Sequence, residues 1–291
     1  MRIENEVLVI GGGLTGAVVL RDLALRGIQE VLLERRDLNA GASGANHGLL
    51  HSGGRYLVTD PASARECALE NKVLKRIASG CVEDTGGLFV ALEEDKDEFV
   101  SDFMSTAARI GLPAEEADLK EVKEEEPFLQ PRIKAAIRVQ DASINPFLTT
   151  QANLEAAQGL GARVLFHTQV TSMIREKGRV TKVDAIRAKT GETVEISADQ
   201  IISAAGPWVD QVGALAGADL RIAYSKGSLL ITNSRLVNRV INRLRPPSDG
   251  DIIVPGETAT ITGTNSMRVE NLDHLRTSAA EVDQLVAEAS K

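Results

Sequence analysis

Cysteine is scarce in this chain, which holds only Cys67 and Cys81 among its 291 residues. Two thiols so far apart in the sequence cannot supply the ligands of a zinc or iron–sulfur centre, so we expect no metal site. Cys67 falls on the apolar face of a predicted helix, which favours a buried thiol. Such sparing use of cysteine is typical of a reducing compartment, and we therefore expect a cytoplasmic protein.

Aromatic residues and positive charge are also in short supply. Aromatic residues make up 3% of the chain, and its formal net charge is −8. Nucleic-acid binding needs a basic face and rings on which bases stack, so we exclude it as the main role. No stretch approaches the roughly 20 apolar residues of a membrane span. Two glutamates within residues 3–10 are unlike a signal peptide.

The most informative segment lies near the start of the chain, which is long enough for two domains. An apolar run at residues 7–10 precedes Gly11-Gly12-Gly13-Leu14-Thr15-Gly16 and a helix-like segment. A second apolar run at residues 31–33 ends at Glu34. This order of strand, glycine turn, helix, strand and acid predicts a βαβ unit that binds a dinucleotide.

Each residue type in this fingerprint has a physical reason. Gly11 permits the tight turn, Gly13 lets the backbone approach a pyrophosphate, and Gly16 lets the helix pack closely on the strand. The helix N-terminus offers N–H groups and a partial positive charge to phosphates. Glu34 can accept hydrogen bonds from a ribose diol and would repel a 2′-phosphate, which disfavours NADP. The alternative for the glycines alone is a sharp turn without a ligand.

A glycine-rich segment follows at residues 41–56 and ends in Arg55-Tyr56. So much glycine, mixed with Ser, Asn and His, is incompatible with an ordinary helix and predicts a loop that brings backbone close to a ligand. A flexible surface linker is the alternative, but the apolar pair Leu49-Leu50 and the ring of Tyr56 argue against simple solvation.

The remainder of the chain alternates helical and strand patterns. Helices are expected at residues 61–78, 96–110, 119–126 and 146–158, and from Ser278 onward. Strands are expected at residues 86–92, 133–140, 163–166, 200–204, 229–232, 252–254 and 258–262. Residues 170–174, 180–188 and 192–196, separated by Lys-Gly and Thr-Gly turns, predict an antiparallel meander.

Several of these motifs together resemble one family. The fingerprint, Glu34-Arg35, the phrase Asn-His-Gly-Leu-Leu-His-Ser-Gly at residues 46–53 and Arg55-Tyr56 resemble the FAD-dependent glycerol-3-phosphate dehydrogenases. That family lies within the D-amino-acid-oxidase-like flavoproteins, and the FAD subunit of its anaerobic members is the most similar. The resemblance continues at residues 63–67, 74–78, 226–231 and 247–249.

The resemblance implies an α/β fold in which a Rossmann-like ββα-sandwich binds FAD and a discontinuous second domain is built on an antiparallel sheet. Residues 1–79 and 144–217 are expected to form the FAD-binding domain, and residues 80–143 and 218–270 the substrate domain. Residues 271–291 are expected to end in a helix. Members of the family continue beyond the position of Lys291, so we expect an N-terminal fragment of such a protein.

The implied activity is oxidation of sn-glycerol 3-phosphate to dihydroxyacetone phosphate, with electrons passed to quinone through partner subunits. The protein is then expected to lie peripherally at the inner face of the plasma membrane. The residues expected to contact FAD are Gly11, Gly13, Gly16, Glu34, Arg35, Ser43, Gly44, His47, Gly48, Leu50, Val170, Ala205, Gly206 and Trp208.

A phosphate-bearing alcohol also needs a cationic anchor and a proton acceptor. Arg55 is the best anchor in the sequence, and Lys226 is a weaker candidate. Tyr56 can orient the substrate, and His51 can serve as the base or contact the edge of the flavin.

Three other functions compete with this interpretation. One is a related FAD-dependent oxidase of amines or hydroxy acids, and another is an inactive, truncated flavin-binding module. The third is an NAD-dependent dehydrogenase, which is disfavoured because the loop at residues 41–56 has no role in that architecture.

Overall fold

A computed structural model describes residues 1–130, 132–272 and 275–291 of the chain. The described residues divide into two compact units. The first unit comprises Met1–Asn46 and Pro146–Tyr224, and the second comprises His47–Asn145 and Ser225–Lys291. The predicted FAD-binding domain included residues 47–79 and 144–145, which lie in the second unit, and the predicted substrate domain included residues 218–224, which lie in the first.

The elements of the first unit alternate as the fingerprint predicts. Its helices are α1 (Leu14–Leu25), α5 (Pro146–Gly159) and α6 (Val209–Leu215), with short 3-10 turns at Ala42–Gly44 and Gly206–Trp208. Its strands are β1 (Arg2–Ile10), β2 (Glu30–Leu33), β9 (Arg163–Leu165), β10 (Thr168–Glu176), β11 (Arg179–Arg187) and β12 (Thr193–Ser203).

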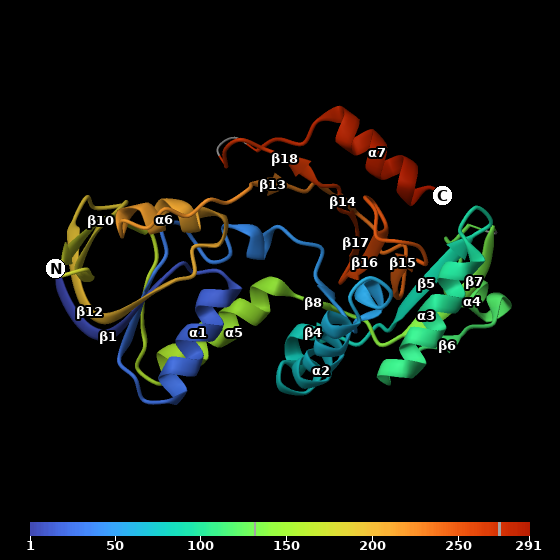
Figure 1. The fold of residues 1–291 in the computed structure, drawn as a ribbon, viewed down its shortest axis with the longest axis horizontal. Coiled ribbons are helices and arrows are strands. Elements are labelled where there is room, and N and C mark those ends of the chain that lie inside the picture. The colour runs from blue at the N-terminus through green and yellow to red at the C-terminus, as the bar shows by residue number, and fades with distance from the viewer. Residues whose placement is uncertain (131, 273–274) are drawn as a thin grey trace. The chain divides into compact units, whose positions relative to one another are not determined.

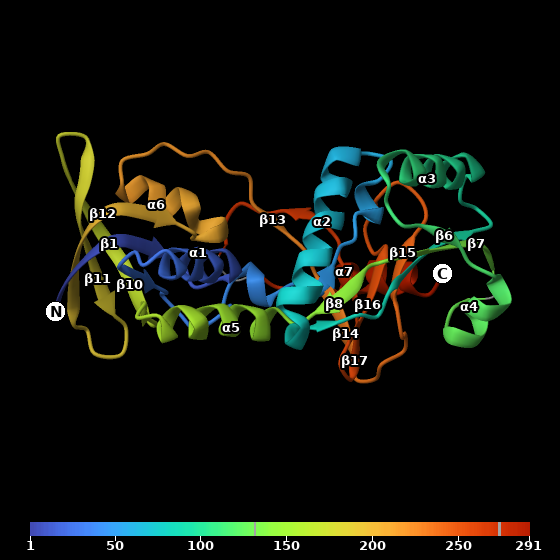
Figure 2. The same ribbon diagram turned by 90° about the horizontal axis from the view of Figure 1, so that it is seen from below.

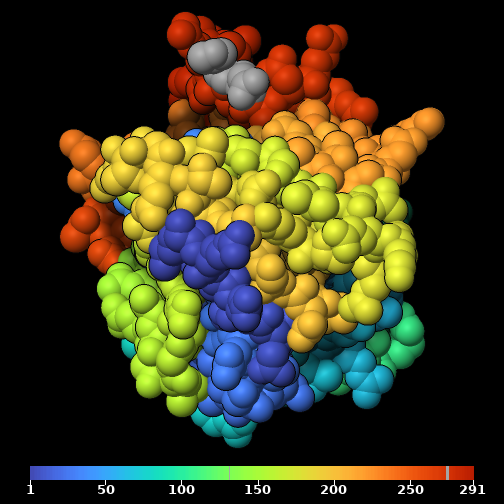
Figure 3. All heavy atoms as spheres, turned by 90° about the vertical axis from the view of Figure 1, so that its left-hand side faces the viewer, coloured from blue at the N-terminus to red at the C-terminus, as the bar shows by residue number. Residues whose placement is uncertain are grey.

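Within the described residues, these strands form one six-stranded sheet in the order β10-β11-β12-β1-β2-β9. The pairs β12–β1, β1–β2 and β2–β9 are parallel, whereas β10–β11 and β11–β12 are antiparallel. Figure 3 shows the start of β1 (dark blue) on the surface beside the yellow residues of the meander, with which it pairs.

The core of the first unit lies on both faces of this sheet. Alternate residues of β1 point to opposite faces, as the pleat of a strand requires. Val7 and Val9 pack with Leu20 of α1 and Leu154 of α5. Leu8 and Ile10 face the apolar side chains of the meander. Figures 1 and 2 both show α1 and α5 side by side, and the two helices are in contact.

The structure corrects the predicted end of the meander. Residues 192–196 and 200–204 were expected as two strands, but they form the single strand β12, Thr193–Ser203. Its first half pairs with β11, and its second half continues beside β1, where Ser197 lies opposite Glu4 and Ala198 opposite Asn5. No turn residue separates the two halves, so the backbone pairing continues across the polar residues.

The second unit contains helices of varied length. They are α2 (Pro61–Ile77), α3 (Asp97–Ile110), α4 (Leu119–Glu125) and α7 (Ala279–Ala289), with 3-10 turns at Gly54–Tyr56 and Ser79–Cys81. The predicted terminal segment includes residues 273 and 274, which lie outside the described residues. Cys67 on α2 is only partly buried, which corrects the expectation of a buried thiol.

The strands of the second unit are β3 (Leu49–Leu50), β4 (Val82–Glu83), β5 (Gly87–Leu92), β6 (Glu115–Glu116), β7 (Ile133–Val139), β8 (Ala142–Ile144), β13 (Ser225–Lys226), β14 (Leu229–Thr232), β15 (Val240–Arg243), β16 (Ile252–Gly256), β17 (Ala259–Gly263) and β18 (Met267–Arg268). For the residues that are described, a seven-stranded sheet has the order β14-β17-β16-β15-β5-β7-β6. It is antiparallel except at β15–β5, and β3-β8-β4 form a small separate sheet.

These observations confirm the predicted fold class, a mixed α/β protein with a parallel dinucleotide-binding sheet and a second unit on a mainly antiparallel sheet. None of the helices in the described parts of the chain is long and apolar enough to cross a membrane.

Candidate functional site

The turn between β1 and α1 is shaped by two glycines that the fold itself requires. Gly11 has a φ of +119°, and a Cβ atom on it would lie 2.3 Å from the carbonyl oxygen of Ala204. A Cβ atom on Gly16 would lie 1.9 Å from the carbonyl oxygen of Gly11. Neither position can carry a side chain without moving backbone, so both glycines are explained by strand–helix packing.

Gly13 differs from these two glycines. It has extended backbone with a φ of −80° and precedes α1 as its N-cap. A Cβ atom there would approach only the side chain of Ser43, whose Oγ would be 2.9 Å away. No backbone atom lies close enough to demand a glycine, so the space in front of Gly13 is available to a ligand.

The first turn of α1 presents an anion-binding end. It contains no acidic residue, and Gly13 provides no side-chain cap. The N–H of Leu14 donates to the Oγ of Ser43 (3.0 Å), which places the hydroxyl of the glycine-rich loop at the start of the helix. Backbone N–H groups and the helix dipole at such an end favour a phosphate.

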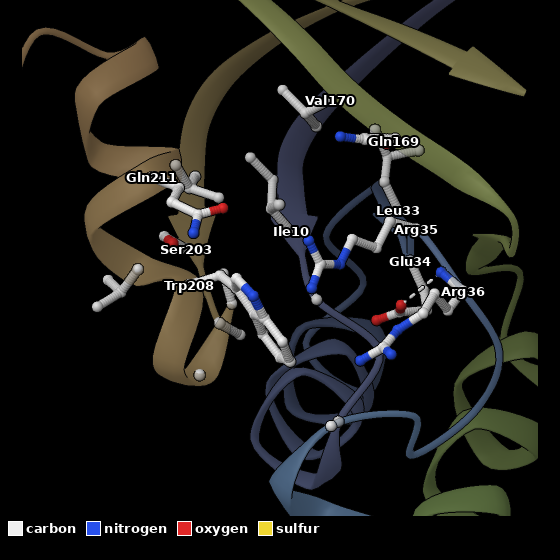
Figure 4. A pocket seen from close by; sticks show the side chains of 18 of the residues that line it. Ile10, Leu33, Glu34, Arg35, Arg36, Gln169, Val170, Ser203, Trp208 and Gln211 are labelled. Carbon is white, nitrogen blue, oxygen red and sulfur yellow. Dashed lines mark hydrogen bonds between the residues drawn. The ribbon is translucent and has the colours of Figure 1, made fainter. Parts of the chain in front are cut away.

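Glu34 is fixed at the end of β2 by two backbone donors. Its Oε2 accepts from the N–H of Gly12 (2.7 Å) and its Oε1 from the N–H of Arg36 (2.7 Å). Figure 4 shows the carboxylate at the edge of the pocket, with the bond to Arg36 dashed. An ionised carboxylate has about four acceptor sites, so two remain for hydroxyl groups of a ligand.

A cavity of about 670 Å³ lies against this turn and belongs wholly to the first unit. That volume is within the usual range of small-molecule sites. Of the predicted cofactor residues in this unit, Gly11, Gly13, Glu34, Arg35, Ser43, Val170, Ala205, Gly206 and Trp208 line it. Gly16 and Gly44 do not, because Gly16 packs under the turn and Gly44 packs against the backbone of Asn39.

Trp208 forms one wall of the cavity and stacks with two arginines. The guanidinium carbon of Arg35 lies 4.1 Å from the centre of its ring, and that of Arg36 lies 5.3 Å away. Figure 4 shows both side chains reaching toward the indole from the end of β2. Stacking of a cation on an indole is favourable, and the two charges lie where an anionic ligand gains from them.

The opposite wall comes from β10, where the pairing with β11 is irregular. The register shifts between Val170 and Ser172, so Thr171 is an extra residue in the ladder. A bulge of this kind bends a strand and frees backbone groups from the sheet. Val170 and Leu33 give this end of the cavity an apolar surface, and Gln169 lies beside them, as Figure 4 shows.

The remaining predicted residues belong to the second unit. Gly48 has a φ of +69°, and its carbonyl oxygen accepts from the N–H of Ile144 (2.7 Å). A Cβ atom on Gly53 would lie 2.2 Å from the carbonyl oxygen of Ala64. On Gly54 it would lie 2.5 Å from the ring of Phe89. The loop is therefore packed tightly on α2 and β5, and the alternative of a flexible surface linker is wrong.

His47, His51 and Tyr56 form a group of rings on this loop. The ring centre of His51 lies 5.4 Å from that of Tyr56 and 6.4 Å from that of His47. The Nδ1 of His47 accepts from the N–H of Leu49 (3.2 Å), which puts the proton of the neutral ring on Nε2. Burial, together with the positive charge of Arg55, lowers the pKa of His51 from 6.5 to about 4. His51 is therefore uncharged at neutral pH, and one of its ring nitrogens carries a free lone pair.

Arg55 is held loosely enough to bind an anion. Among the described residues, its guanidinium makes one hydrogen bond, from Nη2 to the carbonyl oxygen of Ser248 (3.3 Å). Its Nη1 lies 3.9 Å from the carboxylate of Asp251, which Arg245 binds more closely through Nε at 3.1 Å. A guanidinium has five N–H donors, so most of those on Arg55 are not used in hydrogen bonds to the described residues, although its side chain is only 17% exposed.

Lys226 is already engaged. Its ammonium donates to the carboxylate of Glu281 (2.8 Å) and to the carbonyl oxygen of Arg276 (2.5 Å). Glu281 also forms the capping box of α7 with Ser278, so the lysine is tied to the start of that helix. In the parts of the chain that the structure covers, no group of three His, Cys, Asp or Glu side chains could hold a metal ion.

Sequence reasoning missed several polar residues of these sites. Arg36 and Gln211 line the cavity of the first unit, and Asp251 and Arg245 surround Arg55 in the second. Asp141 and Asn71 bind the loop near His51. Asp141, Asn71 and Asp251 are single buried polar residues, which produce no periodic pattern. Arg36 and Gln211 are exposed and look like ordinary surface residues in the sequence.

Comparison with known proteins gives a consistent result. Residues 6–291 match the sequence model of a family described as FAD dependent oxidoreductase. The chain is 45% identical over 290 residues to one of the subunits of the anaerobic glycerol-3-phosphate dehydrogenase of Escherichia coli, covering 99% of this chain and 54% of that protein. It is 43% identical to the corresponding protein of Haloferax volcanii, covering 100% of this chain and 51% of that protein. The chain thus spans about half the length of the curated relatives it matches.

Solved structures share the fold. The L-proline dehydrogenase from P. horikoshii has a TM-score of 0.82 at 21% identity, covering 100% of this chain and 77% of that one. The glycerol-3-phosphate dehydrogenase from Bacillus halodurans, solved as a complex with FAD, has a TM-score of 0.77 at 24% identity. The comparison covers 98% of this chain and 52% of that one.

The geometry at Gly13 predicts that a side chain at this position lowers ADP affinity without lowering the stability of the fold. Gly13→Val should weaken ADP binding by about 1–3 kcal/mol, roughly 5- to 150-fold, because the side chain occupies the space in front of α1. The melting temperature should change little, because only the Ser43 hydroxyl must move. Equilibrium dialysis with labelled ADP and thermal denaturation measure the two effects.

Gly159→Ala is the matched control, since a Cβ atom at Gly159 meets nothing within 4 Å. It should leave ADP binding unchanged. Unaltered ADP affinity in Gly13→Val would contradict the assignment of this turn to a phosphate.

Proposed function

This chain belongs to the family of FAD-dependent oxidoreductases, and we propose that it is the FAD-binding part of an enzyme that oxidises sn-glycerol 3-phosphate to dihydroxyacetone phosphate. The observation that carries the proposal is the identity along nearly the whole chain with proteins named as subunits of anaerobic glycerol-3-phosphate dehydrogenases. The cavity of the first unit and the free donors of Arg55 support it independently.

The first unit fits the ADP half of FAD. The backbone at Gly11–Gly13 and the start of α1 would hold the pyrophosphate, with Ser43 beside it. The carboxylate of Glu34 would bind the ribose diol through its two remaining acceptor sites. Ile10, Leu33 and Val170 provide an apolar surface for adenine, and Arg35 adds a positive charge near the phosphates.

The second unit supplies groups suited to the substrate. A bound FAD would supply the hydride acceptor that oxidation of the alcohol needs. Arg55 binds the phosphate through its free N–H donors, and Tyr56 orients the substrate. His51 is uncharged and accepts the hydroxyl proton, so that the alcohol becomes a ketone. Contact of His51 with the flavin edge is the other role for this residue.

The remaining residues of the prediction keep their proposed roles. His47, Gly48 and Leu50 are proposed as contacts of the flavin, on the same loop as His51. Lys226 is the second position to test as a phosphate anchor, although its pairing with Glu281 makes it a weaker one than Arg55.

The names of the relatives indicate partner subunits. Because those proteins are named as subunits of their enzymes, they have partner subunits, and we propose the same for the enzyme to which this chain belongs. Electrons would then pass from the flavin to quinone through those partners, at the inner face of the plasma membrane. No nucleic-acid partner is proposed, because a net charge of −8 does not favour phosphate binding along a surface.

Anaerobic reduction of the bound flavin tests the function. The full-length protein, purified with its flavin, is mixed with sn-glycerol 3-phosphate without oxygen, and the visible flavin absorbance is followed. Rapid bleaching is expected with this substrate but not with glycerol, because glycerol lacks the phosphate that Arg55 binds.

Bleaching by L-proline or glycine and not by sn-glycerol 3-phosphate would instead indicate an oxidase of amines. A flavin that binds and is reduced by none of these compounds would indicate a flavin-binding module without this activity.

Arg55→Ala should raise the Michaelis constant for sn-glycerol 3-phosphate roughly 10- to 150-fold, while the FAD content stays unchanged. The reason is that a charge-assisted hydrogen bond to a phosphate contributes about 1.5–3 kcal/mol. Arg109→Ala, at an exposed position on α3, is the control. Equal kinetics for Arg55→Ala and the wild type would move the anchor elsewhere, with Lys226→Ala as the next variant.

A further inference from the structure

His51 is flanked by two peptide groups that buried side chains hold in place. On one side, the Nδ2 of Asn71 donates to the carbonyl oxygen of Leu50 (3.1 Å). On the other side, the N–H of Ser52 donates to the Oδ1 of Asp141 (2.7 Å). Asn71 comes from α2, and Asp141 comes from the turn between β7 and β8. Each of the two side chains is 1% exposed.

Asp141 is the centre of a larger buried network. The hydroxyl of Ser52 donates to the same Oδ1 (2.7 Å), and the Nδ2 of Asn242 donates to Oδ2 (3.2 Å). Asn242 lies on β15 and is fully buried. A Cβ atom on Gly87 would lie 2.8 Å from the Cβ of Asp141, so β5 needs a glycine to make room for this carboxyl.

Burial of the Asp141 carboxyl costs folding free energy, so stability alone does not explain this network. Burial raises the pKa of Asp141, and the two donors on Ser52 act in the opposite direction by stabilising the charged form. An apolar residue of similar size is often at least as stabilising in a core as a buried charge. The geometry instead gives the network a specific effect, because two of its donors belong to Ser52, the residue next to His51.

We propose that Asn71 and Asp141 are positioning residues, which clamp the peptide groups on both sides of His51 and so fix where its imidazole lies. The use of His51 as a proton acceptor rests on the proposed function, whereas the clamp itself does not.

The environment of His51 provides a direct readout of the clamp. The groups that face it are the rings of His47 and Tyr56 and the guanidinium of Arg55, with the carboxyl of Asp141 behind Ser52. Burial is the largest cause of its low pKa, about 4 in place of 6.5. Release of either peptide group lets the ring reach water, so its pKa should rise toward the ordinary value.

Titration of the histidine rings by NMR measures this pKa in the 291-residue chain itself. The chain has four histidines, and His51→Gln assigns the signal. Asn71→Ala leaves every charge near His51 in place and should raise the pKa of His51 by about one unit or more. Asp141→Asn should raise it by less, because the loss of a nearby carboxylate acts in the opposite direction. Ser52→Ala removes only the hydroxyl bond to Asp141 and should produce a smaller rise, which keeps the test possible if a stronger variant does not fold.

Asp95→Asn is the matched control. Asp95 is also a buried carboxylate of the second unit, and it accepts from the N–H of Leu92 (2.8 Å) and from Arg243 (2.7 Å). This variant should lose stability without changing the titration of His51. An unchanged His51 pKa in Asp141→Asn, Asn71→Ala and Ser52→Ala, with a loss of melting temperature like that of Asp95→Asn, would overturn the proposal.

Enzyme kinetics of the Asn71, Asp141 and Ser52 variants distinguish a failure of the proposed clamp from a failure of the proposed function. In the full-length enzyme, the clamp variants should lower kcat more than they raise KM, and the acid limb of the pH–rate profile should move to higher pH. If no activity with sn-glycerol 3-phosphate exists, the proposed function fails while the NMR result still decides the clamp.

Discussion

Three backbone segments of the first unit meet at Gly11, and the ligand cavity depends on how closely they approach. The turn after β1 passes within contact distance of Ala204, just beyond the end of β12, and the first turn of α1 packs on Gly11 through Gly16. Because β12 is continuous and parallel to β1, its end delivers Ala205, Gly206 and Trp208 to the side of the cavity opposite β10. The wall that carries Trp208 is therefore a consequence of the same close approach that forms the glycine turn.

In the second unit, buried polar groups hold the loop at residues 47–56 in addition to apolar packing against Phe89. The loop at residues 47–56 is fixed through its backbone by Ile144, Asn71 and Asp141. The side chains of Arg55 and His51 take no part in fixing this backbone. Arg55 keeps hydrogen-bond donors that no described residue uses, and burial together with the charge of Arg55 keeps His51 uncharged. The contrast with Lys226 is informative, since its full pairing with Glu281 ties it to α7. Availability of hydrogen-bonding groups, more than the type of residue, distinguishes a candidate anchor from a structural cation.

The first unit was predicted well from local sequence patterns, because its strand, turn and helix signals follow one another in a single short segment. Alternation in β1, the glycine spacing and Glu34 all belong to one short segment whose geometry does not depend on distant residues. The strand β15 was not predicted, because its four residues include the buried Asn242 and Arg243 and show no alternation. Its place in the sheet comes from parallel pairing with β5, a contact between segments far apart in the chain. The roles of Asp141 and Asn71 were not predicted for a similar reason, because their hydrogen-bond partners lie in other elements.

The cavity of the first unit is proposed to bind the ADP part of a dinucleotide without a 2′-phosphate. Trp208 is the single tryptophan of the chain and lines that cavity, so its fluorescence reports binding directly. The chain is titrated with ADP and, separately, with AMP and with adenosine 2′,5′-bisphosphate, which is AMP with an added 2′-phosphate. We expect a saturable change with ADP, and an affinity for the 2′-phosphate compound at least about tenfold lower than for AMP, a difference of about 1.4 kcal/mol that repulsion by Glu34 would supply. No response to ADP, or equal binding of AMP and adenosine 2′,5′-bisphosphate, would contradict it.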